Sequence, residues 1–454
     1  MKVDPSIFKA YDIRGTYQEN LDEKVAHAVG KAFIKVVNPS KVVLGRDGRV
    51  SSPSLHQALM DSLLNSGVNV LDVGQVSTDM YYYACAQTGL PGIMITASHN
   101  PKQYNGFKMV KKIPYLLSGD EGIQDMRVFI ENDDLPLDTI EKGTQEKWDV
   151  MAEFIEKMLS LVDTTKLKPM KVVADTANGM VGPSLTELFK QLPQLQLTPL
   201  YFDVDGTFPN HGGDPLQSVN RRELQERVVA EQADLGFAFD PDGDRFFCID
   251  ARGRFVSGDF MTALLAQYFL AKKPNASIVY DLRASWAVPD LVTAAHGKAL
   301  YNRVGHAFIK KRMMDENAIF GGEVTGHYYF QDFFYCDSGI APMLFLLDLL
   351  THSDKKLDVL LDELGQKYFI SGEINTSGVD GDAVMMKLEQ TYAPSAKNVL
   401  KDDGISIEYD EWHFNVRKSN TEPLVRLNLE AKDQKTMEEK RDEILAVIQS
   451  YKKE

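Results

Sequence analysis

The chain has 454 residues, of which 44% are hydrophobic and 25% are charged, and its formal net charge is −15 at pH 7. This length exceeds what one hydrophobic core normally supports, so we expect an ordinary globular protein of three or four domains. The negative charge argues against binding to nucleic acid, although an anionic small molecule could bind where arginine and lysine gather.

Targeting and redox features favour a cytoplasmic protein that does not bind a membrane. The opening residues, MKVDPSIFKAYD, contain an acid and a proline where a signal peptide would need an apolar core. The apolar segment IAPMLFLLDLL is too short to span a bilayer and is interrupted by Asp348. The cysteines, Cys85, Cys248 and Cys336, are far apart and odd in number, which predicts reduced and mostly buried thiols.

Strands and helices alternate along most of the chain. Residues 41–45 and 91–96 are typical of strands, and residues 52–67 of an amphipathic helix that ends in glycine. The same alternation returns at 170–245 and at 277–323. It predicts parallel or mixed sheets with helices on both faces and ligands beyond the carboxyl ends of the strands.

The last part of the chain differs from the rest. Residues 404–431 alternate between polar and apolar and predict antiparallel strands joined by the loop RKSNTEP, while residues 433–454 predict a helix. We therefore expect α/β domains followed by a C-terminal α+β domain. The polar segments between these patterns place the domains at 1–145, 146–252, 253–366 and 367–454.

The motif TASHNP follows the strand expected at 91–96 and sets Ser98 beside His99. The Asn-Pro pair forms a turn, because proline disfavours a helical conformation in the residue before it. In isolation the motif is typical of a strand end at which polar residues complete a turn. A serine hydrolase is a poor alternative, since neighbouring residues on a strand point to opposite faces and no G-x-S-x-G motif surrounds the serine.

The motif FDPDGDR, residues 239–245, carries the most specific chemical signal. Asp240, Asp242 and Asp244 alternate, so their carboxylates can converge on one hard cation. An EF-hand would require glycine and glutamate where this loop has Arg245 and Ala251. An acidic solvated turn is the alternative, but three carboxylates between apolar strands would repel one another without a counter-ion, which favours a metal such as Mg²⁺.

Two further loops suit an anionic ligand that is rich in hydroxyl groups. The loop RKSNTEP offers the donors of Arg417, Ser419, Asn420 and Thr421, which could hold a phosphate or could complete a polar hairpin turn. The loop GGEVTGH presents a carboxylate, a hydroxyl and an imidazole that could bind sugar hydroxyls, namely Glu323, Thr325 and His327. A single histidine such as His327 is as often a core residue as a reactive one.

Together the motifs TASHNP, DPDGDR, GEVTGH and RKSNTEP, in this order and spacing, resemble the phosphoserine, metal, sugar and phosphate loops of the α-D-phosphohexomutases. The resemblance extends from FKAYDIRG near the start to NTEPLVRLNLE near the end, and it is strongest to the phosphomannomutase and phosphoglucomutase branch. It implies four domains around a central cleft, of which the first three share one α/β core and the fourth closes over the substrate.

The resemblance also implies roles for individual residues. Ser98 would carry the transferable phosphoryl group and complete the magnesium site of the three aspartates. The residues implied in catalysis around that group are Arg14, His99, Lys108 and Arg245. The residues implied in substrate binding are Tyr11, Arg283, His306, Glu323, Thr325, His327, Arg417, Ser419, Asn420 and Thr421. Two of these depart from the family pattern, because Thr325 stands where serine is commoner and Arg283 where lysine is frequent.

The implied activity is the interconversion of mannose 1-phosphate and mannose 6-phosphate, and also of the glucose phosphates, through phosphoserine and a hexose 1,6-bisphosphate. This bisphosphate would act as an activator, the hexose phosphate as the substrate, and the chain as a monomer or weak homodimer. A phosphoglucosamine mutase is the first alternative, which Asn420 disfavours because that branch usually has glycine there. A non-catalytic sugar-phosphate-binding protein is the second. The general base stays open among Lys108, Arg14, His306 and His327.

Overall fold

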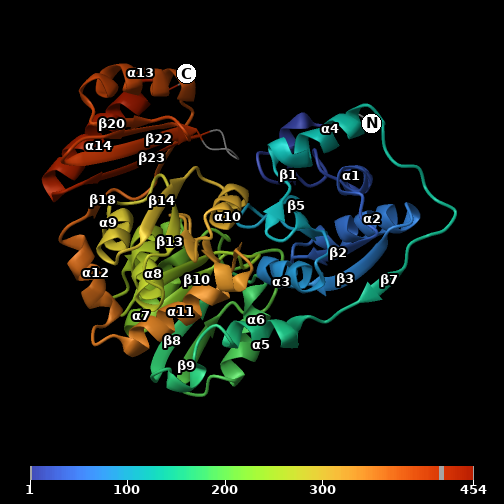
Figure 1. Ribbon diagram of the computed structural model, residues 1–454, viewed down its shortest axis with the longest axis horizontal. Helices are drawn as coiled ribbons and strands as arrows, with labels where there is room; N and C mark the ends of the chain where they lie inside the picture. The colour runs from blue at the N-terminus through green and yellow to red at the C-terminus, as the bar shows by residue number, and fades with distance from the viewer. Residues whose placement is uncertain (1–2, 419–423, 453–454) are drawn as a thin grey trace.

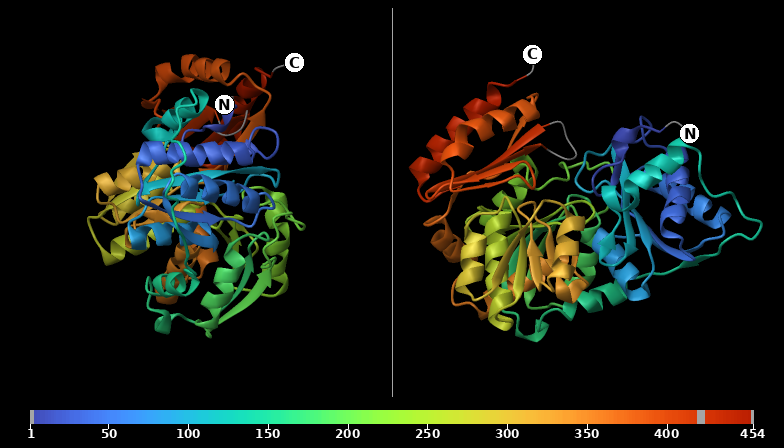
Figure 2. Two further views of the ribbon diagram at one scale, coloured as in Figure 1. Left: turned by 90° about the vertical axis from the view of Figure 1, so that its right-hand side faces the viewer. Right: turned by 45° about the horizontal axis from the view of Figure 1, so that its top comes forward.

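The computed structural model describes residues 3–418 and 424–452 and arranges them as four sheets with flanking helices (Figure 1). Figure 2 shows the N-terminal and C-terminal parts flanking the second and third sheets. The described chain thus has the expected class, three mixed α/β domains and a C-terminal domain in which helices pack on an antiparallel sheet. The domain limits expected from the sequence stay a prediction.

The first domain has the strand order β1-β5-β4-β2-β3-β7, with β6 paired to β5. Its strands are β1 (Ile13–Thr16), β2 (Lys41–Arg46), β3 (Asn69–Gln75), β4 (Gly92–Ile95), β5 (Tyr104–Lys112), β6 (Tyr115–Leu116) and β7 (Gln145–Lys147). Its helices are α1 (Glu23–Val37), α2 (Ser52–Asn65), α3 (Thr78–Thr88) and α4 (Gln124–Glu131).

The second and third domains have five-stranded sheets in the orders β12-β11-β10-β8-β9 and β14-β13-β15-β16-β17. The second contains α5 (Met151–Leu159), β8 (Met170–Asp175), α6 (Val181–Lys190), β9 (Leu195–Leu200), α7 (Ser218–Ala230), β10 (Leu235–Phe239), β11 (Phe246–Asp250) and β12 (Phe255–Val256). The third contains α8 (Gly258–Lys272), β13 (Ser277–Asp281), α9 (Ala287–Ala294), β14 (Lys298–Asn302), α10 (His306–Asp315), β15 (Phe320–Gly322), β16 (Tyr328–Phe330), β17 (Cys336–Asp337), α11 (Ile340–His352) and α12 (Leu357–Gly365).

The C-terminal sheet has the order β18-β23-β22-β21-β20, with β19 also paired to β23. Its elements are β18 (Phe369–Ile370), β19 (Ile374–Ser377), α13 (Gly381–Tyr392), β20 (Asn398–Leu400), β21 (Ile405–Glu408), β22 (Trp412–Lys418), β23 (Leu424–Ala431) and α14 (Gln434–Gln449). Glu430 on β23 fastens this domain to the third, because its carboxylate accepts hydrogen bonds from the Ser285 hydroxyl at 3.0 Å and the Trp286 amide at 2.9 Å.

One structural unit recurs in the first three sheets and positions the motifs. In each sheet a strand that is parallel to one neighbour is followed by an antiparallel partner, namely β4 then β5, β10 then β11, and β15 then β16. The motifs TASHNP, DPDGDR and GEVTGH lie in these three connections. Of the fourth motif, RKSNTEP, Arg417 and Lys418 end β22, and residues 419–423 lie outside the described residues. Each of the first three motifs therefore follows the carboxyl end of a strand.

The hydrophobic clusters show which domains are packed together. One continuous cluster runs through the first three domains and includes α3 of the first, whose other cluster is separate, and the C-terminal domain encloses a core of its own. Helix α11 is apolar on most sides because it is buried in this shared cluster, which explains the segment IAPMLFLLDLL. Its Asp348 is compensated by Lys272 at 3.0 Å. Among the described residues no helix is both long and apolar enough to cross a bilayer, and the three cysteines are free and buried as expected.

Candidate active site

Ser98 lies beyond the end of β4 and lines a cleft between the four domains. Its backbone has φ +49°, in the left-handed region that L-residues rarely adopt, and its amide donates to Thr96 Oγ1 at 2.9 Å. The Ser98 hydroxyl donates to Asp240 Oδ2 of the second domain at 2.8 Å. A rare backbone conformation thus points the serine side chain across a domain boundary at the acidic loop.

One expectation about Ser98, which is only 1% exposed, needs correction. The Ser98 hydroxyl lies 3.3 Å from Nδ1 of His99, although alternation along a strand would have separated the two side chains. They meet because the extended conformation ends at Ile95, so the alternation no longer applies at Ser98.

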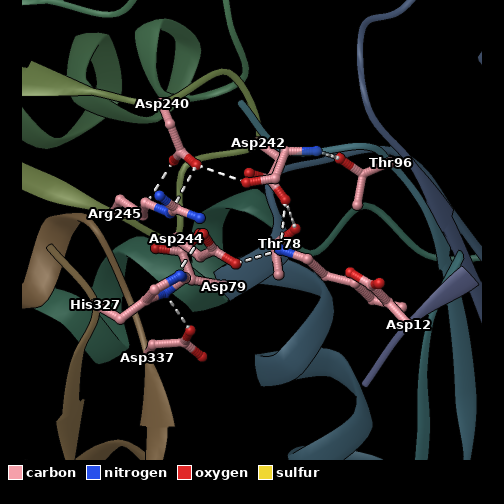
Figure 3. A network of polar contacts seen from close by, with 12 residues as sticks. Asp12, Thr78, Asp79, Thr96, Asp240, Asp242, Asp244, Arg245, His327 and Asp337 are labelled. Atoms are coloured by element: carbon pink, nitrogen blue, oxygen red, sulfur yellow. Dashed lines mark hydrogen bonds and ion pairs between the residues drawn. The ribbon is translucent and has the colours of Figure 1, made fainter. Parts of the chain in front are cut away.

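Asp240, Asp242 and Asp244 converge as the sequence predicts (Figure 3). All three are fully buried, and one carboxylate oxygen of each lies within 4.8 Å of the others. The Lys108 ammonium of β5 contacts Asp242 at 2.7 Å and also binds Asp244. The first turn of α3 adds a further contact, because the Thr78 hydroxyl donates to Asp242 Oδ2 at 2.7 Å.

This acidic loop fits a hard divalent cation. Oδ1 of Asp242 and Oδ1 of Asp244 are buried and accept no hydrogen bond from any described residue. Buried carboxylate oxygens without donors are costly, and oxygen-only ligands are those that Mg²⁺ prefers. The Lys108 ammonium compensates part of the negative charge of the three aspartates. A bound cation would compensate the rest.

The charges of the loop are strongly coupled. Burial, together with Asp242 and Asp244, raises the pKa of Asp240 well above its usual range. Burial also opposes the charge on Asp242, but the Lys108 ammonium outweighs it and lowers the pKa of this carboxyl. Burial likewise acts against Lys108, yet Asp242 and Asp244 raise the pKa of its ammonium. The lysine therefore keeps its proton, while Asp240 is the carboxyl most prone to hold one.

Cationic side chains from the first, second and C-terminal domains line the same cleft as Ser98. The residues that line the cleft are Tyr11, Arg14, Ser98, His99, Lys108, Arg245, Val304, Gly305, His306, Glu323, Thr325, His327, Arg417 and Arg426. Arg14 is oriented by Asp12, which accepts from its Nε at 2.7 Å, and Arg245 donates its amide to Asp240 Oδ1 at 3.1 Å. The lining thus contains five arginine or lysine side chains and one carboxylate, that of Glu323, which suits a phosphorylated ligand.

The third domain supplies polar groups opposite Ser98. Glu323 Oε2 accepts from the Gly305 amide at 3.2 Å, and Oε1 accepts from the Tyr329 hydroxyl. His306 begins α10 and is buried, and neither of its ring nitrogens has a hydrogen-bond partner among the described residues. Burial and the nearby Lys310 lower the pKa of His306, so its imidazole is neutral at pH 7.

Four of the residues expected in catalysis or substrate binding are not seen lining the cleft. Arg283 is buried, where it binds Asp281 Oδ2 at 2.9 Å and Glu373 Oε2 at 2.8 Å. These two carboxylates hold its guanidinium outside the cleft in this arrangement, and its part in substrate binding stays a prediction. The other three lie outside the described residues, namely Ser419, Asn420 and Thr421.

Sequence reasoning missed a buried charge chain behind His327. Nδ1 of His327 lies 2.8 Å from Asp337 Oδ2, and Asp337 Oδ1 binds the buried Lys310 ammonium at 2.6 Å. Arg426, which lines the cleft beside Arg417, was also missed. No local motif marks these residues, since Lys310 and Asp337 come from different elements that meet only in the folded sheet. Asp12 could have been found, because it lies inside the AYDIRG motif.

Comparisons with known proteins agree with this geometry. Four family models of phosphoglucomutase/phosphomannomutase match consecutive segments, namely alpha/beta/alpha domains I, II and III at 5–131, 152–253 and 257–368 and the C-terminal domain at 373–447. The chain belongs to the phosphoglucomutase/phosphomannomutase family. It is therefore a phosphohexomutase, an intramolecular phosphotransferase.

Relatives of this phosphohexomutase cover nearly its whole length. A phosphomannomutase of Escherichia coli is 40% identical over 449 residues, which are 97% of this chain and 98% of the relative. Phosphohexose mutases of Xanthomonas campestris pv. campestris are 38% identical over 426 residues, 94% of this chain and 95% of the relative. The crystal structure of a phosphoglucomutase/phosphomannomutase family protein from Burkholderia thailandensis matches with a TM-score of 0.88 and 33% identity, covering 99% of this chain and 98% of that one.

The binding of Mg²⁺ to this phosphohexomutase should strengthen as the pH rises. Because burial and its neighbours raise the pKa of Asp240, a proton on that carboxyl competes with the cation, and raising the pH removes the competitor. Asp242→Asn should weaken binding by at least about tenfold, since it removes a charged ligand. Isothermal titration calorimetry at several pH values measures both effects, with Asp348→Asn as a control for losing a buried aspartate elsewhere. Affinity that falls with rising pH, or that survives in Asp242→Asn, would contradict the assignment.

Proposed function

We propose that the chain is a phosphomannomutase that interconverts mannose 1-phosphate and mannose 6-phosphate, and that it also accepts the glucose phosphates. The observation that carries this proposal is the 2.8 Å contact between Ser98 Oγ and Asp240 Oδ2, and Ser98 also lines a cleft rich in arginine and lysine. A hydroxyl held in this way can carry a phosphoryl group between a cation-binding loop and a ligand in the cleft. The relatives named phosphomannomutase support the choice of mannose.

In the proposed reaction Ser98 starts as phosphoserine. The free hydroxyl oxygen of a hexose monophosphate attacks this phosphorus, the bond between phosphorus and Ser98 Oγ breaks, and a hexose 1,6-bisphosphate forms. The bisphosphate turns over in the cleft and returns its other phosphoryl group to Ser98. Free hexose 1,6-bisphosphate acts as activator because it can phosphorylate Ser98 when the group has been lost.

The residues around Ser98 stabilise the transferred group. Mg²⁺ held by the three aspartates would neutralise charge on the phosphoryl oxygens. Arg14, Lys108 and Arg245 place further positive charge at the same end of the cleft, where it acts without reorganisation during transfer. His99 lies against Ser98 Oγ, and burial together with Arg245 and Arg14 lowers the pKa of its ring, so we assign it a neutral positioning contact.

The candidates for the general base narrow to two imidazoles. Although burial acts against their charges, carboxylates raise the pKa of both Lys108 and Arg14, so both groups stay protonated at neutral pH. His306 and His327 remain, and both line the cleft. His306 is neutral with unpartnered ring nitrogens, which makes it available to accept the proton of the attacking hydroxyl.

The sugar and phosphate loops would hold the far end of the substrate. We assign Glu323 and Thr325 to the 3- and 4-hydroxyls of the sugar, with Tyr11 and His327 beside them. Arg417, Ser419, Asn420 and Thr421 are assigned to the phosphate that does not react. Since mannose and glucose differ only at C2, neither loop reads the distinguishing hydroxyl, and discrimination should amount to about 1–3 kcal/mol at most.

A coupled mutase assay with mannose 1-phosphate, glucose 1-phosphate and glucosamine 1-phosphate tests the proposed function. Mannose 1-phosphate and glucose 1-phosphate should both be converted to the 6-phosphates, and Ser98→Ala should lose this activity by at least about a thousandfold because no group remains to carry the phosphoryl. Preferred turnover of glucosamine 1-phosphate would establish the amino-sugar alternative. Binding of all three without turnover would establish the sugar-phosphate-binding protein.

Glu323→Gln should impair mannose 1-phosphate and glucose 1-phosphate about equally and in both directions. The 3- and 4-hydroxyls exchange places when the bisphosphate turns over, so one carboxylate serves both orientations. We expect a loss of about tenfold to a hundredfold in kcat/KM, as for a charged hydrogen bond worth about 1.5–3 kcal/mol. Glu316→Gln, an exposed glutamate in an ion pair with Arg312, is the matched control. A Glu323→Gln enzyme that lost only the mannose activity would show instead that Glu323 reads C2.

A further inference from the structure

A buried arginine outside the cleft forms hydrogen bonds with the backbone of the loop that contains Ser98. Arg49 follows β2, is only 1% exposed, and is not among the described residues that line the cleft. Its Nη2 donates to the carbonyl oxygens of Ser98 at 2.6 Å and Asn100 at 2.7 Å. Its Nη1 donates to those of Pro101 at 2.9 Å and Tyr104 at 3.0 Å. One guanidinium therefore holds three carbonyls of the loop that connects β4 to β5 and the first carbonyl of β5.

The charge of Arg49 is compensated away from this loop. Its Nε lies 3.2 Å from Asp47 Oδ2, and Asp47 Oδ1 accepts from the Ser52 hydroxyl at 2.5 Å and from the Arg49 amide at 3.0 Å. The ion pair leaves both Nη atoms of Arg49 for the carbonyls. Lysine would keep the charge but could not supply this planar fork.

Ser98 needs such a restraint because its backbone is strained. A φ of +49° is unfavourable for serine, so the loop would relax to another conformation unless contacts held it. The amide of Ser98 is held by Thr96 Oγ1 and its carbonyl by Arg49. With both backbone groups fixed, the hydroxyl is directed at Asp240 Oδ2.

The same arginine lies under a loop of the second domain. The Phe208 ring packs over its guanidinium at 5.3 Å. A Cβ placed on Gly206 would come within 2.3 Å of Gly48 O and 2.6 Å of Arg49 Cα, so the two loops are in close contact. Arg49 thus restrains the Ser98 loop at the place where the domain that carries the acidic loop packs against it.

We propose that Arg49 is a positioning residue for phosphoryl transfer, which holds the Ser98 loop in the one conformation that aims the serine oxygen at the acidic loop. The inference rests on the proposed function, since it assigns Arg49 a part in the reaction of Ser98. Arg49 does not itself line the cleft among the described residues and contacts it only through the Ser98 backbone, so it acts on the rate of transfer rather than on the binding of the hexose phosphate.

Arg49→Lys tests this role, with Arg46→Lys as the matched control. Arg46 is the last residue of β2, three positions before Arg49, is only half-buried, and its side chain donates to the Asp47 carbonyl at 3.2 Å. The first measurement is of kcat and KM with the hexose 1-phosphate that the wild-type enzyme turns over. The second is the rate at which hexose 1,6-bisphosphate phosphorylates Ser98, followed by intact-mass analysis of quenched samples. The melting temperature is measured as well. Arg49→Lys should lower kcat and the phosphorylation rate by about a hundredfold, as expected for a displacement near 1 Å, with KM changed less than about threefold.

A second variant keeps the proposal testable if Arg49→Lys does not fold. Thr96→Val removes the acceptor that holds the Ser98 amide, so it loosens the same conformation from the other side and should also lower kcat more than it changes KM. Added ethylguanidine should restore part of the kcat of Arg49→Ala, which a general loss of stability would not allow.

Three results overturn the proposal. The first is a kcat for Arg49→Lys within threefold of the wild type. The second is a rise in the KM of Arg49→Lys as large as the fall in its kcat. The third applies if Arg49→Lys does not fold, and it is a folded Thr96→Val enzyme that has the kinetics of the wild type. In each of these the wild type still turns over hexose phosphate, so the proposed function stands. A wild-type chain that turns over none would show the failure of the proposed function itself.

Discussion

The burial of negative charge at Asp240, Asp242 and Asp244 is the constraint on which the rest of the site depends. Three fully buried carboxylates cannot share one loop unless cations approach them. Lys108 provides one cation from the first domain, and Thr78 adds a donor from the start of α3. The first domain is therefore bound to the second through the same groups that would hold Mg²⁺ beside Ser98, so charge compensation and catalytic geometry are one arrangement.

The recurring strand pairs explain why the motifs meet. In each of the first three sheets, one strand of a parallel pair is connected directly to an antiparallel neighbour. The connection leaves the polar residues of the motif at the carboxyl end of the parallel strand. The second and third sheets share one hydrophobic cluster, which also takes in α3 and one side of the first sheet, whereas the C-terminal domain has a cluster of its own. The shared cluster fixes the acidic and sugar loops relative to each other, while Glu430 and its partners Ser285 and Trp286 set the C-terminal domain against this pair.

The sequence was sufficient for features that are local in the chain. Alternating aspartates within six residues predict their own convergence, and strand-helix alternation predicted the mixed sheets. It was insufficient where a side chain depends on a distant partner. Arg283 binds Glu373, 90 positions along the chain, and so lies outside the cleft. Arg49 holds carbonyls some 50 positions away, and the contact of Ser98 with His99 follows from a left-handed φ that the letters SHNP do not specify.

The central claim is that Ser98 carries the phosphoryl group between the two positions of the sugar, and a single-turnover experiment tests it most directly. The enzyme is labelled with ³²P on Ser98, mixed with an equimolar amount of unlabelled mannose 1-phosphate, and quenched over time. The account predicts that the label leaves the protein for a hexose 1,6-bisphosphate and then appears in mannose 6-phosphate. Label that is released as inorganic phosphate, or that stays on the protein while mannose 6-phosphate accumulates, would contradict it.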